Sequence, residues 1–180
     1  SQLFPYSDID VLLLVPPDNA ALRPALEAFV TACWDTGLEI GSSVRTVDEC
    51  LALAQQDITA QTSMLEMRHI GGRTEHFAQL LAQLPSTFHP QDFFLAKHLE
   101  LRQRHTKFEN APYALEPNCK ESPGGLRDLH TILWVAKAAN LGHDWHELAQ
   151  HGILTNLEAQ QLERNETTLF QIRARLHGVE

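Results

Sequence analysis

The first third of the chain alternates short apolar runs with amphipathic stretches. Residues 9–15 form an apolar, partly β-branched run that stops at Pro16-Pro17, and this pattern predicts a buried strand. Over residues 20–35 the apolar positions recur at helical spacing, and Gly37 follows them. Residues 38–46 are expected to form a second strand. This succession of strand, helix and strand predicts a region in which helices cover a sheet.

Two further helices and a third strand are expected next. Thr46 and Glu49, three residues apart, predict a capped helix start. Asp57 or Thr59 is expected to cap a further short helix. Residues 64–70 then alternate between apolar and polar types, which predicts a third strand ended by Gly71-Gly72.

Beyond Gly72 the pattern becomes helical. The loop over residues 109–125 holds three prolines and interrupts this helical part. The chain is therefore expected to be α+β, with an α/β part over residues 1–72 and a helical domain over residues 73–180. Helices are expected at residues 76–84, 91–108, 126–139, 145–151 and 155–179.

Charge and composition exclude several classes of protein. The net charge of −9, from 23 acidic and 14 basic residues, argues against a protein that tracks DNA or RNA phosphates. The apolar run ending at Val15 is far shorter than the roughly 20 residues that span a bilayer, so no membrane partner is expected. Three scattered cysteines form no CxxC pair, and a cytoplasmic location is the simplest setting.

Asp8 and Asp10 are the strongest candidates for metal-binding residues. Residues two apart on a strand project to the same side, so both carboxylates would lie together. Two such carboxylates repel unless a cation lies between them, and hard oxygen ligands suit Mg²⁺. The alternative is that Asp8 belongs to a turn and Asp10 faces solvent at an edge strand.

Four separated segments resemble one family and occur in its order: residues 3–14, 38–46, 113–118 and 120–131. They are similar to the bifunctional PII uridylyltransferase/uridylyl-removing enzymes, which belong to the polymerase-β-type nucleotidyltransferase superfamily. The resemblance implies a nucleotidyltransferase sheet with flanking helices, lacking its first strand and glycine-rich turn at the N-terminus, followed by an all-helical domain. An isolated chain of this kind is expected to be inactive.

The resemblance implies transfer of UMP from UTP to a tyrosine of the PII signalling protein. Asp8 and Asp10 would hold Mg²⁺ in a two-metal site. A third catalytic carboxylate is expected on a neighbouring strand, and Glu66 is the first candidate, with Glu39 and Asp57 as rivals. The alternative for Glu66 is an exposed strand carboxylate that pairs with Arg68.

The segment over residues 120–128 resembles the start of the family's helical domain. Its glycines would let the backbone approach a ligand, and the helix that begins at Leu126 would present free N–H groups to an anion. The alternative is an ordinary turn between domains. The residues expected to bind substrate are Ser7, Lys120, Gly124, Gly125 and Arg127.

Three further points complete the sequence-based picture. His143-Asp144 is the dipeptide of HD phosphohydrolases, but its companion residues are missing, so Asp144 is expected to cap the next helix.

A related transferase that adenylylates glutamine synthetase is one alternative function. A non-catalytic module that senses nucleotides or binds a partner is the other, and in that case the carboxylates would serve structure alone.

Overall fold

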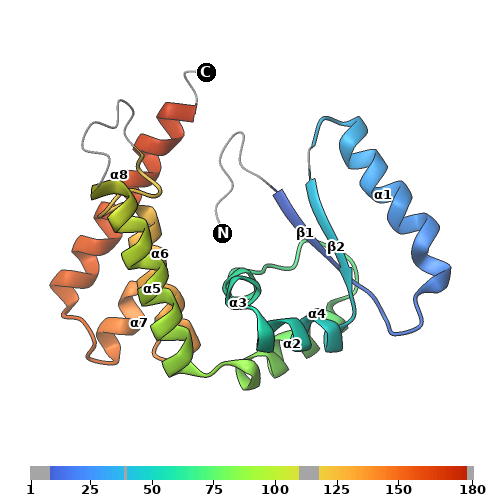
Figure 1. Ribbon diagram of the computed structural model, residues 1–180, viewed down its shortest axis with the longest axis horizontal. Helices are drawn as coiled ribbons and strands as arrows, with labels where there is room; N and C mark the ends of the chain where they lie inside the picture. The colour runs from blue at the N-terminus through green and yellow to red at the C-terminus, as the bar shows by residue number, and fades with distance from the viewer. Residues whose placement is uncertain (1–8, 39, 110–117, 178–180) are drawn as a thin grey trace. The chain divides into compact units, whose positions relative to one another are not determined.

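The computed structural model describes residues 9–38, 40–109 and 118–177. The chain divides into two compact units, Ser1–Phe88 and His89–Glu180, and each is considered by itself. The first holds a small parallel sheet with helices, and the second is helical (Figure 1). The α+β class expected from the sequence is therefore confirmed. The division expected after residue 72 falls inside the first unit, before its last helix.

A parallel pair of strands lies at the start of the first unit. Strands β1 (Ile9–Leu14) and β2 (Ile40–Arg45) pair in register from Ile9 with Ile40 to Leu14 with Arg45. Parallel neighbours need a crossover connection, which helix α1 (Arg23–Asp35) supplies after the short 3₁₀ turn η1 (Ala20–Leu22). Both strands and this helix were predicted by the sequence, and the structure confirms them.

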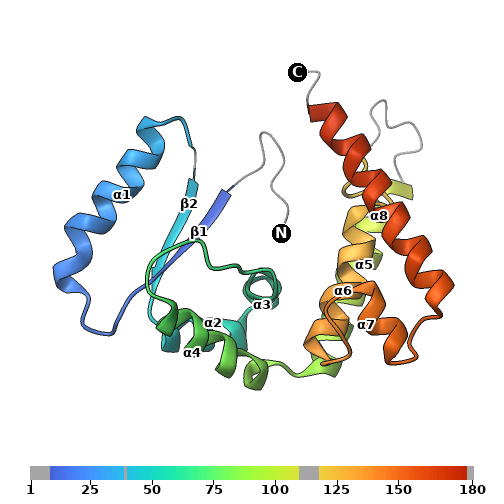
Figure 2. The same ribbon diagram turned by 180° about the vertical axis from the view of Figure 1, so that it is seen from behind.

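Helix α1 lies along one face of the strand pair (Figures 1 and 2). An open groove of about 650 Å³ is lined by residues of α1, among them Leu26 and Val30, and by Val44 of β2. Val44 pairs with Leu13, and paired residues of parallel strands share a side, so the odd-numbered β1 residues face α1. The even-numbered residues, including Asp10, therefore face away from α1.

Side-chain caps fix the starts of the next two helices. Helix α2 (Val47–Gln56) begins with a capping box: the Glu49 N–H donates to Thr46 Oγ1 at 3.2 Å, and the Thr46 N–H donates to Glu49 Oε2 at 2.7 Å. Helix α3 (Ile58–Leu65) begins at Asp57, whose Oδ1 accepts from the backbone of Thr59 at 2.7 Å. Both predicted caps are confirmed.

The predicted third strand over residues 64–70 is wrong. Helix α3 continues through Leu65, and no regular structure follows until helix α4 (Thr74–Gln83). The Asp57 cap commits the segment to helix, and Met64 is buried on that helix. The alternation that suggested a strand runs across the end of a helix and into a loop. A seven-residue alternation is therefore weaker evidence than a capped helix start.

The core of the first unit is mainly helical. Helix α2 packs against α3, α4 and the 3₁₀ turn η2 (Leu84–Thr87), and Cys50, Ala54 and Leu80 are completely buried there. Gln61 is also buried, and its Nε2 donates to Thr87 O at 3.3 Å, which ties α3 to η2. By contrast, α1 contains no buried residue.

The second unit consists of four helices within its described residues. Helices α5 and α6 pack together, and α8 packs on α6 and α7. Leu129, Trp145 and Ala159 are buried at the centre, one from each of α6, α7 and α8. All four helices were predicted within a few residues of their observed ends. They are α5 (Pro90–Glu109), α6 (Leu126–Ala138), α7 (Trp145–Gln150) and α8 (Asn156–His177).

None of the helices in the described parts of the chain combines the length and the apolar character that a membrane crossing requires. This agrees with the expectation from the sequence that no apolar run is long enough to span a bilayer.

Candidate functional site

Asp10 lies on β1 with an exposed side chain, on the face of the sheet opposite α1. Its neighbour across the parallel pair is Gly41 of β2. A Cβ atom built on Gly41 would lie 2.7 Å from Asp10 Oδ1, so the carboxylate occupies the space that a side chain at position 41 would take. The carboxylate therefore lies over the backbone of β2.

The structure describes only some of the other residues expected near Asp10. Asp8, Ser7 and Glu39 lie outside the described residues. Glu66 follows the last residue of α3 and is partly buried, so it does not stand on a neighbouring strand as expected. Asp57 is engaged as the cap of α3. The catalytic roles of Asp8, Asp10 and Glu66 stay predictions.

The donor chemistry of Asp10 fits Mg²⁺. The ion binds through one or two carboxylates and keeps several waters, so an exposed carboxylate over an open backbone position suits it. Among the described residues, no group of three or more His, Cys, Asp or Glu side chains is placed to hold a metal. Asp8, which the sequence predicts as the second protein ligand, lies outside the described residues.

The segment before α6 is a turn closed by its own hydrogen bonds. Asn118 Oδ1 accepts from the backbone N–H groups of Lys120 at 3.1 Å and Glu121 at 2.8 Å, and the Ser122 hydroxyl donates to the Asn118 carbonyl. Gly124 has a φ of +76°, the left-handed region that favours glycine. The turn therefore has a defined conformation that leads directly into α6.

Gly125 brings three carbonyl groups into close contact with the backbone. A Cβ atom there would lie 2.8 Å from the carbonyl oxygens of Cys119 and Ser122 and 3.1 Å from that of Lys120. The glycine was expected to admit a ligand. Within the described residues, the groups that approach it are carbonyl oxygens of the turn itself.

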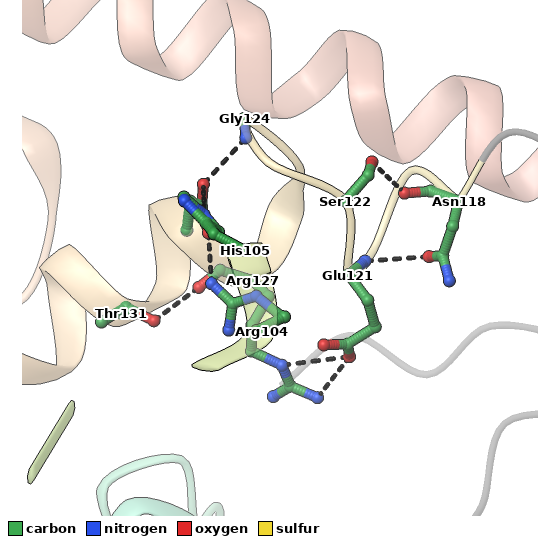
Figure 3. A network of polar contacts seen from close by, with 9 residues as sticks. Arg104, His105, Asn118, Glu121, Ser122, Gly124, Arg127 and Thr131 are labelled. Carbon is green, nitrogen blue, oxygen red and sulfur yellow. Dashed lines mark hydrogen bonds and ion pairs between the residues drawn. The ribbon is translucent and has the colours of Figure 1, made fainter. Parts of the chain in front are cut away.

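Asp128, in the first turn of α6, joins this turn to α5. Figure 3 shows three of its partners, Arg104, His105 and Gly124. Its carboxylate pairs with Arg104, accepts from the Gly124 N–H at 2.8 Å, and lies 2.9 Å from His105 Nε2. Arg104 and Asp128 are both largely buried, with side chains 13% and 17% exposed. We call Asp128, Arg104, His105 and Gly124 the Asp128 cluster.

The Asp128 cluster favours the charged carboxylate. Burial alone raises the pKa of Asp128. The hydrogen bonds from the Gly124 N–H, His105 and Arg104 more than offset it, and the pKa lies below its usual value of 3.8. Sequence reasoning missed the cluster, although an acidic residue in the first turn of a helix after two glycines was a usable signal.

The groups expected to bind phosphate have partners inside the chain. The Leu126 and Arg127 N–H groups both donate at 2.9 Å, to the carbonyls of Cys119 and Lys120. The Arg127 guanidinium donates to Glu121 Oε1 at 2.9 Å, and Lys120 Nζ lies 4.0 Å from the same carboxylate. A substrate-binding role for Lys120, Gly124, Gly125 and Arg127 stays a prediction.

The dipeptide His143-Asp144 is a helix start. Asp144 Oδ1 accepts from the Glu147 N–H at 2.8 Å, and Glu147 Oε2 accepts from the His143 N–H at 2.7 Å. The expected cap of α7 is therefore confirmed.

Replacing Gly125 by alanine is expected to destabilise the second unit by about 2 kcal/mol, the usual cost of overpacking. With φ at −80° the backbone suits any residue, so the loss would report the contacts with the three carbonyl groups. Urea denaturation of the chain measures it. Gly71→Ala is the control, since no atom lies within 4 Å of that position and its φ is not positive. An equal loss in both variants would contradict the steric explanation.

Comparisons with known proteins show what the chain is similar to. Residues 92–180 match the family model described as GlnD PII-uridylyltransferase. No solved structure matches the chain significantly.

Similar proteins cover nearly the whole chain, and each is named bifunctional uridylyltransferase/uridylyl-removing enzyme. One from Cupriavidus pinatubonensis is 58% identical over 99% of the chain, and one from Cupriavidus metallidurans is 55% identical over 98%. One from Burkholderia orbicola is 54% identical over 99%. The chain spans 21% of the length of each of these relatives. Over nearly its whole length, the chain is therefore similar to part of the bifunctional uridylyltransferase/uridylyl-removing enzymes.

Proposed function

We propose that the chain is part of the nucleotidyltransferase region of an enzyme that transfers UMP from UTP to a tyrosine of the PII signalling protein, with Mg²⁺. The observation that carries this is Asp10, which stands exposed on a parallel strand with its carboxylate over Gly41, in a chain 58% identical to a named uridylyltransferase. The family model carries the name of the PII target.

Asp10 and Asp8 are the residues that would hold Mg²⁺. The bound ions supply charge neutralisation for the triphosphate and for the attacking and leaving oxygens. The contribution of Asp10 is a carboxylate held at a fixed place on a strand, which suits a reaction that depends mainly on positioning. Glu66, beside the end of α3, is our candidate for accepting the proton of the tyrosine hydroxyl.

A nucleotide-selectivity assay tests the proposal. The full-length protein that contains this chain is incubated with purified PII and Mg²⁺, and with UTP or ATP labelled at the α-phosphate. With UTP, label is expected on a PII tyrosine. With ATP, the label on PII is expected to stay at background. The 180-residue chain alone, about a fifth of its relatives' length, is expected to give no transfer.

Each alternative has its own result in this assay. Transfer from ATP to glutamine synthetase in place of PII would indicate a protein adenylyltransferase. Nucleotide binding without any transfer would indicate a non-catalytic module. Either result would overturn the proposal.

A further inference from the structure

Gly41 is a glycine that the fold of β2 does not require. Its backbone is not in the positive-φ region, and it lies within a strand on an exposed position. Glycine inside a strand weakens it, because the unfolded chain loses more conformational freedom and no side chain packs. Something other than strand geometry therefore has to explain a glycine at this position.

The contacts around Gly41 supply one explanation. The nearest heavy atom to a Cβ at this position would be Asp10 Oδ1, at 2.7 Å, a separation that Cβ contacts do not tolerate. The next two atoms, Asp10 Cγ at 3.8 Å and Ile9 O at 3.9 Å, are at ordinary contact distance. Only the carboxylate oxygen would thus be displaced by a methyl group, and the backbone would not.

Glycine inside a strand often marks a place where another group approaches the backbone closely. Here the approaching group is the carboxylate of the paired residue on β1. Parallel pairing fixes the register, so residue 41 is the position of β2 that lies directly beside Asp10. The absence of a side chain there leaves room for the carboxylate over β2.

We propose that Gly41 is a positioning residue. Because it has no side chain, the Asp10 carboxylate has room to adopt the orientation that binds the divalent ion. This deepens the proposed function and rests on it, because it requires Asp10 to be a metal ligand. Gly41 touches neither metal nor nucleotide in this role; it acts through Asp10. A methyl group at position 41 turns the carboxylate to another rotamer and leaves the strand pair intact.

Mn²⁺ binding to the full-length protein, followed by the EPR signal of the free ion, tests the proposal. Only the Mn²⁺ binding that is lost in the Asp10→Asn variant is assigned to this site. Gly41→Ala is expected to weaken this binding by about 10-fold or more, the scale seen when a residue that orients a metal ligand is lost. Its melting temperature is expected to stay within about 2 °C of the unsubstituted protein, since a flexible side chain gives way.

Two further variants separate positioning from a general effect. Gly71→Ala is the matched control, because no atom lies within 4 Å of that position and its φ is not positive, and it should bind Mn²⁺ normally. In an Asp10→Asn background, Gly41→Ala should cause no further loss, because the two residues act as a unit.

The outcomes distinguish this inference from the proposed function. If Asp10→Asn removes binding but Gly41→Ala binds Mn²⁺ normally, the positioning role is overturned and the metal site stands. If Asp10→Asn leaves Mn²⁺ binding unchanged, the metal site itself fails, and the positioning role fails with it. A melting temperature lowered by more than about 5 °C in Gly41→Ala would also overturn the inference, because the backbone and not the carboxylate would then have moved.

Discussion

Asp10→Asn in the full-length protein is expected to lower uridylyl transfer to PII by more than about 100-fold, the scale seen when a major charge-stabilising group is lost. The substitution keeps the shape of the side chain and removes its negative charge, and a neutral amide is a poor ligand for a hard cation. Asp10 is exposed and no other described residue depends on it for a hydrogen bond, so the fold should be unaffected. Initial rates with labelled UTP measure the change.

Asp35→Asn is the matched control for this prediction. Asp35 is also an exposed aspartate of the first unit, at the end of α1, and lies on an element that faces the other side of the sheet. It should retain nearly full activity. The double variant Asp8→Asn with Asp10→Asn should be at background. Activity that survives in the double variant would show that these carboxylates do not hold the metal.

Local signals in the sequence were enough to predict three helix starts and both strands. The Thr46 and Glu49 pair, Asp57 and Asp144 each form the cap that their spacing indicated. Such caps depend on hydrogen bonds between residues two or three apart, so the sequence alone contains them. The strands also have local signals, since β1 is a short apolar run that stops before Pro16-Pro17, and β2 ends at the Thr46 cap.

The incorrect prediction of a third strand shows the limit of local sequence patterns. Residues 65–68 alternate between apolar and polar types as a strand would, but a strand also needs a partner, and partners depend on distant residues. The helix that begins at Asp57 competes for the same residues and buries Met64 against the unit's core. A cap and a helical apolar face together outweigh a short alternation.

The turn before α6 shows a second limit. Glycines before a helix predict room for a close approach, but not which group approaches. Here the neighbours are the carbonyls of Cys119, Lys120 and Ser122, together with Asp128 on the Gly124 N–H. Two of the Asp128 partners, Arg104 and His105, come from α5, more than twenty residues earlier. No local pattern could have paired them.

Asp128→Ala is expected to destabilise the second unit by about 3 kcal/mol, because it leaves the largely buried Arg104 without its carboxylate partner. Urea denaturation of the chain, followed by tryptophan fluorescence, measures the loss. Trp134 and Trp145 are buried in this unit and report its unfolding, whereas Trp34 is 62% exposed and should change little. Asp92→Ala is the control, since this exposed aspartate in the first turn of α5 should cost less than about 1 kcal/mol.

The same cluster predicts how stability depends on pH. The pKa of Asp128 is lower in the folded chain than its usual value of 3.8, so the unfolded chain binds the proton more tightly. The stabilisation is therefore complete above that value and is lost as the pH falls from it through the lowered folded pKa. Asp128→Asn imitates the protonated carboxyl, so its difference in unfolding free energy from the unsubstituted chain should be constant near neutral pH and shrink in acid. A free-energy difference between the two proteins that stays constant down to pH values below 3.8 would contradict this prediction. Proton binding by Asp128 would then be the same in the folded and unfolded chains, and the carboxylate would gain no stabilising contacts on folding.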